Sequence, residues 1–247
     1  MGVTVLVYSV ICVFLAAIVR GYSGFGFSLL AITALSLALS PAEIVPSIFM
    51  LEVAASLHLL PGIWRDIHWR SLLPLIVGCL IGTPFGVYAL ANVPAAPMQI
   101  ALAIFVLAAT LLLWWGFTLE KLPGPAGSVA VGTASGLCNG AFGIGGPPVI
   151  LFYFSTEGGH AVGRASIIAF FLATDTIGLA LLANEGLVTS AAAYRALTFV
   201  LPLAVGVWIG ARSFKTADPV MFRKIVLALL AVLAVLSAAK SLYALLQ

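Results

Sequence analysis

The sequence predicts an all-α polytopic membrane protein built from two inverted repeats. Its 247 residues are 63% hydrophobic and only 8% charged, with a mean hydropathy of +1.21, whereas soluble domains are ~25% charged. Apolar stretches of about 20 residues, long enough to span a bilayer, recur along nearly the whole chain. Two related glycine-rich motifs interrupt them at matching places in the two halves. The loops are too short to form a soluble domain.

We expect ten apolar segments, five in each half, with the repeats covering 1–119 and 120–247 of a single membrane domain. The first half contains 3–19, 29–39, 43–60, 71–91 and 98–117. The second half contains 125–141, 148–156, 164–183, 196–211 and 221–245. The second segment of each half is too short to span, so each repeat should contain a glycine-tipped helical hairpin or broken helix plus three transmembrane helices.

A shared nine-residue pattern relates the two halves. Pro74-Leu-Ile-Val-Gly-Cys-Leu-Ile-Gly82 and Pro202-Leu-Ala-Val-Gly-Val-Trp-Ile-Gly210 agree at six of nine positions. Both contain two glycines four residues apart, a spacing that lets helices approach closely. The glycine motifs align as well, with Gly24-Phe-Gly26 on Gly143-Ile-Gly145. The pattern indicates an internal duplication; chance similarity between two Leu-, Val- and Gly-rich segments is the alternative.

The lysines and arginines favour hairpins over broken helices, because basic residues gather on the cytoplasmic side of a membrane protein. With broken helices they divide five to five between the two sides. With hairpins, Arg195 and Lys240 oppose the eight that share the inner side, which are Arg65, Arg70, Lys121, Arg164, Arg212, Lys215, Arg223 and Lys224. Each half then has an odd number of segments, so the repeats are inverted and both termini lie outside. We expect a bacterial inner membrane protein with periplasmic termini.

The glycine-rich tips are the predicted binding site. Ser28 can cap the short segment after the first tip, and prolines follow Gly145-Gly146 at the second. Both short helices would point their N-termini, with free N–H groups and about half a positive charge, at one central site. Such ends suit a small anion. The expected substrate-binding residues are Arg20, Ser23, Gly24, Phe25, Gly26, Ser28, Asn139, Gly143, Gly145, Gly146 and Pro147.

Three more polar residues are candidates for coupling or gating. Glu52 and Asp175 lie in the middle of 43–60 and 164–183, and a carboxylate at mid-bilayer usually faces a cavity or a partner. Desolvation would let either carry a proton, although a structural hydrogen bond would also explain them. His58 follows Glu52 by six residues and is either a proton relay or an interfacial histidine. Arg20 is either the counter-charge of the anion or an ordinary interfacial arginine.

Other functions find less support in the residues. An intramembrane enzyme needs a catalytic constellation, and the chain lacks both His-Glu-x-x-His and a pair of acids in a protease-like setting. No Walker motif is present for ATP-driven transport. A channel is the remaining alternative, since broken segments also line channels. We expect no cofactor, no metal and no nucleic-acid partner. Proton coupling and assembly of identical chains are both compatible with the sequence.

These motifs resemble one known family. Gly24-Phe-Gly-Phe-Ser-Leu-Leu30, Gly140-Ala-Phe-Gly-Ile-Gly-Gly-Pro-Pro-Val-Ile-Leu151 and the paired Pro-Leu-x-Val-Gly-x-x-Ile-Gly helices are similar to those of the sulfite exporter TauE/SafE transporters. The resemblance covers almost the whole chain, including its size and its duplicated layout. It implies export of a small sulfur-containing anion such as sulfite or an organosulfonate. The sulfur in this expectation comes from the resemblance alone.

Overall fold

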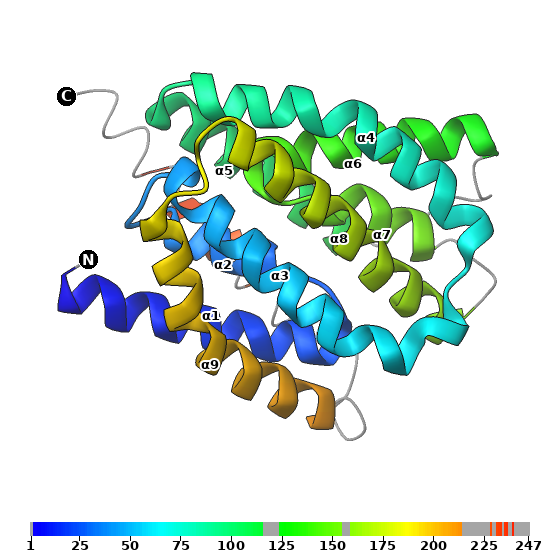
Figure 1. The fold of residues 1–247 in the computed structure, drawn as a ribbon, viewed down its shortest axis with the longest axis horizontal. Helices are drawn as coiled ribbons and strands as arrows, with labels where there is room; N and C mark the ends of the chain where they lie inside the picture. The colour runs from blue at the N-terminus through cyan, green and yellow to red at the C-terminus, as the bar shows by residue number, and fades with distance from the viewer. Residues whose placement is uncertain are drawn as a thin grey trace.

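A computed structural model describes residues 2–115, 124–154 and 159–213, together with isolated helical positions between 228 and 239. The described residues are helical and contain no strand (Figure 1). The helices are α1 Val3–Ser23, α2 Phe27–Leu35, α3 Pro41–Ile63, α4 Trp69–Asn92, α5 Ala95–Trp114, α6 Pro125–Phe142, α7 Gly146–Phe154, α8 Gly159–Asn184 and α9 Ser190–Ser213, with the short 3₁₀ turn η1 Trp64–Asp66 after α3.

Nine of the ten predicted segments coincide with these helices, and the tenth, 221–245, lies outside the continuously described residues. Five of the basic residues used to predict the orientation of the chain also lie outside the described residues: Lys121, Lys215, Arg223, Lys224 and Lys240. The largest errors are at the starts of α8 and α9, which begin five and six residues before the predicted 164 and 196. Small and polar residues open both helices, so the apolar pattern appears only after the first turn.

Six helices are long and apolar enough to cross a membrane, judged by length and composition. They cover Val3–Ser23, Pro41–Asp66, Trp69–Asn92, Ala95–Leu112, Ala161–Asn184 and Ser190–Arg212. Helices α2 and α7 have nine residues each, about 13 Å at 1.5 Å per residue, and are too short to cross. The structure therefore confirms a polytopic all-α membrane protein.

Glycines in the left-handed region end α1 and α6 in the same way. The amide of Gly24 (φ 79°) donates to the carbonyl of Arg20 at 2.8 Å, and the amide of Gly143 (φ 70°) donates to the carbonyl of Asn139 at 2.7 Å. This backbone conformation favours glycine, because it lacks a Cβ. Helix α2 then folds back along α1, since the Tyr8 hydroxyl near the start of α1 donates to the Ala34 carbonyl near the end of α2 at 2.7 Å.

Two helix pairs join the halves of the chain. Helix α4 packs along α6, and α1 packs along α9. A Cβ on Gly78 of α4 would collide with the Val129 carbonyl of α6, and one on Gly210 of α9 would collide with the Ile18 carbonyl of α1. The close approach predicted from the paired glycine patterns is thus confirmed, and each pair links one half to the other.

Helices α3 and α8 pack together at the centre of the bundle, between the α4–α6 pair and the α1–α9 pair (Figure 1). Each is tied to the start of a helix in the opposite half. The Ser47 hydroxyl of α3 donates to the Ala192 carbonyl at the start of α9 at 2.9 Å. The His68 amide just before α4 donates to the Ser166 hydroxyl of α8 at 3.0 Å.

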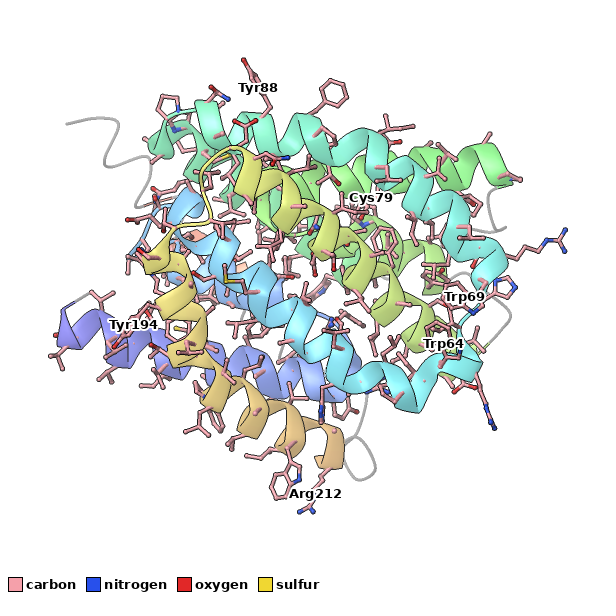
Figure 2. All side chains as sticks on the ribbon, in the orientation of Figure 1. Trp64, Trp69, Cys79, Tyr88, Tyr194 and Arg212 are labelled. Carbon is pink, nitrogen blue, oxygen red and sulfur yellow. The ribbon has the colours of Figure 1, made fainter. Side chains whose placement is uncertain are left out.

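The outer surface is apolar, as expected of a bundle that faces lipid. Leu197 and Leu201 of α9 are 74% and 72% exposed, and a surface that large and apolar is unusual for a soluble monomer. Figure 2 shows Tyr88 pointing away from the bundle, and Trp64 and Trp69 together at one end. Their ring centroids are 5.1 Å apart, edge to face. Paired tryptophans at helix ends are typical of a membrane–water interface.

Candidate functional site

The last helical turn of α1 places a buried arginine in the interior of the bundle. Arg20 is 0% exposed. Its Nη1 donates to the Gly24 carbonyl at 2.8 Å, and its Nη2 donates to the Ser56 hydroxyl of α3 at 2.8 Å. The same Nη2 lies 3.0 Å from Oε2 of Glu52, which is 1% exposed. A buried ion pair of this kind depends on both partners, because either charge alone would be stranded in a medium of low dielectric constant.

Glu52 also caps the short helix α2. Its Oε1 accepts a hydrogen bond from the amide of Ser28, the second residue of α2, at 3.3 Å. The positive end of α2 and the Arg20 guanidinium therefore converge on one carboxylate. Glu52 lies about three turns into α3, at 3.6 residues per turn, within the apolar interior that its neighbours form, and it reaches both donors from there.

The second glycine tip is held by an amide instead of a guanidinium. Asn139 donates from Nδ2 to Oδ1 of Asp175 at 2.9 Å, and its Oδ1 accepts from the Gly145 amide at 3.1 Å. The Ser135 hydroxyl donates to the Gly145 carbonyl. Asn139 and Asp175 are both buried. Pro147 and Pro148 carry no N–H, so among the first three residues of α7 only Gly146 offers a backbone donor.

The two tips use residues at matching places in the chain. Arg20 contacts Ser56, and Asn139 contacts Asp175, in both cases across 36 positions. The second pair lies 119 positions after the first, from 20 to 139 and from 56 to 175. Ser47 and Ser166, which tie α3 and α8 to the opposite halves, differ by the same 119 positions.

Phe171 joins the two tips. The guanidinium carbon of Arg20 lies 5.4 Å from the centre of the Phe171 ring, a distance typical of a cation–π contact. The same ring lies close to Gly146 at the start of α7, 3.4 Å from the position that a Cβ there would take. Asp175 interacts electrostatically with both Glu52 and Arg20. These contacts bring Arg20, Glu52, Asn139 and Asp175 near one another in the interior.

Sequence reasoning overlooked Arg164, which it used only as a loop charge for orientation. Because α8 begins at Gly159, Arg164 lies inside that helix, with its side chain packed against Gly24 and within electrostatic range of Arg20. Phe171 and Ser135 were overlooked as well. The one sequence signal for Phe171 is the 119-residue spacing, which places it at the position matching Glu52.

Some predicted residues lie outside this cluster. His58 is exposed and makes no hydrogen bond or ion pair that links it to Glu52 in the described part of the chain. The Ser23 hydroxyl donates to the carbonyls of Val19 and Phe25, so it stabilises the turn itself. Gly26 has φ 89° and lies just before α2, and Pro147 is buried. Phe25, partly buried, is the middle residue of the turn. Within the residues that the structure describes, no three His, Cys, Asp or Glu side chains form a metal-binding group.

Comparisons with known proteins identify the family of the chain. Residues 9–237 match the sequence model of the sulfite exporter TauE/SafE family. The chain is also similar to a protein of Cupriavidus necator named "probable sulfite/organosulfonate exporter TauE", with 26% identity over 212 residues that cover 82% of each chain. No solved structure matches the chain. The chain therefore belongs to the sulfite exporter TauE/SafE family, and it is a membrane transporter and not an enzyme.

Proposed function

We propose that this protein is a secondary transporter that exports a small sulfur-containing anion, such as sulfite or an organosulfonate, with the anion bound between the two glycine tips. The convergence of the buried Arg20 guanidinium and the positive end of α2 on one carboxylate carries the proposal. Donors that hold a carboxylate suit other small oxyanions, because both offer charged oxygens to N–H groups. The name of the Cupriavidus necator relative supports the choice of a sulfur oxyanion.

The layout of the chain supports two inverted halves that work by alternating access. Contacts recur at 119-residue spacing. In each of the α1–α9 and α4–α6 pairs, a helix of the first half packs against a helix of the second half. A transporter of this kind holds its substrate at the interface of the repeats and rocks one group of helices against the other. Arg20, Glu52 and Asp175 are all closed off from solvent, as in an occluded state. In this scheme both termini are periplasmic.

Proton coupling through Glu52 or Asp175 completes the proposal. Both carboxylates are buried near the bundle centre, where ionisable residues commonly serve ion or proton pathways. Arg20 pairs with Glu52, and Asn139 donates a hydrogen bond to Asp175, so each carboxylate has one polar partner that it could exchange during transport. Such an exchange would change the proton affinity of the carboxylate and move a proton.

The full chain reconstituted in liposomes tests this function. We expect sulfite or a short alkanesulfonate to stabilise the purified protein against heat, and to be transported with saturation and counterflow. Sulfate, thiosulfate and chloride complete the panel and measure selectivity. A channel would show neither saturation nor counterflow. Absence of both stabilisation and flux with every sulfur oxyanion would reject the substrate class.

A further inference from the structure

Glu52 occupies the donors that the proposed function assigns to the transported anion. One carboxylate oxygen accepts from the Ser28 amide at 3.3 Å, and the other lies 3.0 Å from Arg20 Nη2. Arg20 has a further donor, Nε, that is buried and makes no hydrogen bond among the described residues. A buried donor without a partner is rare in a folded protein and calls for a ligand, so Arg20 can bind an oxyanion with a donor that Glu52 does not use.

We propose that Glu52 is an intramolecular competitor for the anion site: the transported anion binds Arg20 and the start of α2 only after the Glu52 carboxylate has left them and taken up a proton. The inference rests on the proposed function, because it concerns the same site. It adds an order of events and a stoichiometry that the proposed function leaves open.

The charges around Glu52 explain why the proton is needed. Glu52 pairs with Arg20 of α1 and accepts a hydrogen bond from the Ser28 amide of α2. The Asp175 carboxylate of α8 lies within electrostatic range of Glu52, and Arg164 of α8 lies within electrostatic range of Arg20. Arg195 of α9 donates to the carbonyl of Glu43, which precedes Glu52 by nine positions in α3. Once an anion takes Arg20, an ionised Glu52 would face both that anion and Asp175 in a closed core, which protonation avoids.

The step is balanced in charge. The Glu52 carboxylate takes one proton from the aqueous side on which the anion enters and becomes a neutral carboxylic acid. After the anion leaves on the other side, the acid releases this proton there and returns to Arg20 and Ser28. One monovalent anion and one proton therefore cross together, and the cycle moves no net charge.

Methanesulfonate is the probe for this inference, because it stays singly charged over the pH range in which proteins are stable, so any pH dependence belongs to the protein. Its affinity for the full chain in lipid nanodiscs is measured by calorimetry across pH. We expect wild-type affinity to rise as pH falls, by up to about tenfold per unit, with uptake of about one proton per anion. Glu52→Gln should bind at least as tightly as wild type at high pH, with a flat profile.

Matched variants separate competition from a structural role. Glu43→Gln makes the same change at the exposed start of α3 and should keep the wild-type profile. Asp175→Asn removes a neighbouring charge and should shift the profile to lower pH while keeping its slope. If Glu52→Gln does not fold, Glu52→Asp serves in its place, because the shorter side chain keeps its charge near Arg20 but loses reach to Ser28; it should bind more tightly than wild type at high pH.

The outcomes are distinct. Three results would overturn the competition while leaving the proposed function intact. They are wild-type affinity that does not depend on pH, weaker binding in Glu52→Gln than in wild type, and a pH dependence that only Asp175→Asn abolishes. If wild-type protein binds neither methanesulfonate nor sulfite at any pH, the proposed function fails and this inference fails with it.

Discussion

Arg20 and Glu52 form an ion pair at 3.0 Å between side chains that are almost completely buried. They come from different helices, α1 and α3, and between them they fix the turn after α1 and the start of α2. The pair therefore links the stability of the bundle to the chemistry of the proposed site, and substitutions there should separate the two.

The first prediction concerns the ion pair itself. Arg20→Met should lower the free energy of unfolding by about 3–5 kcal/mol, because it leaves Glu52 charged and buried without its partner. Arg20→Met combined with Glu52→Leu should recover much of that loss, yet bind no anion. Unfolding in detergent and sulfite binding would measure the two effects. Arg65→Met, at an exposed arginine, is the control. A double variant no more stable than Arg20→Met would contradict the pairing.

The second prediction concerns the α4–α6 interface. Gly78→Ala places a methyl group against the Val129 carbonyl and 2.7 Å from the Thr133 amide nitrogen. The helices must separate, and we expect a loss of roughly 1–3 kcal/mol in unfolding free energy. Gly62→Ala makes the same change on α3 where nothing lies within 4 Å, so its melting temperature should match or exceed that of wild type. Equal stability of the two variants would refute the close packing.

The third prediction concerns the second tip. A methyl group on Gly145 would lie 3.0 Å from both Asn139 Cβ and Ser135 Oγ, which hold this turn. Gly145→Ala should therefore displace Asn139 and reduce transport by about tenfold, which corresponds to a lost hydrogen bond of about 1–2 kcal/mol. Gly163→Ala, whose new methyl would meet only ordinary contacts from 3.7 Å, is the control in the same half. Normal flux in folded Gly145→Ala protein would remove this tip from the mechanism.

The fourth prediction concerns orientation. The turn between α3 and α4 and the turn between α4 and α5 lie at opposite ends of α4, so a cysteine in each should face opposite sides of the membrane. In a chain whose native cysteines are replaced, Arg65→Cys should resist a membrane-impermeant maleimide added to the outside of intact cells, and Val93→Cys should react. The reverse pattern would place both termini in the cytoplasm.

Much of the fold could be predicted because in lipid each spanning segment must satisfy its own backbone hydrogen bonds, so hydropathy and glycine reveal the helices directly. The buried acids Glu52 and Asp175 could be selected for the same reason, since charge is rare within an apolar helix. Gly24 and Gly143 could be placed at the tips because left-handed turns favour glycine.

Partnerships between segments could not be predicted, because periodicity describes one helix at a time. The capping of α2 by Glu52, a residue of α3, depends on how those helices pack. The place of Arg164 depends on α8 beginning earlier than its apolar pattern. His58 was chosen for its nearness to Glu52 in sequence, but six residues at 100° each turn it to a different face of α3.

The pairing of α1 with α9 has a consequence for biogenesis. The translocon inserts helices in chain order, so α1 enters the membrane long before its partner has been synthesised. Until then Gly21, against which the Val207 carbonyl of α9 finally rests, is exposed to lipid or to a temporary neighbour. A chain that stops before residue 190 would therefore keep the contact of α1 with α2 but leave the α9-facing side of α1, with its glycine, uncovered in the bilayer.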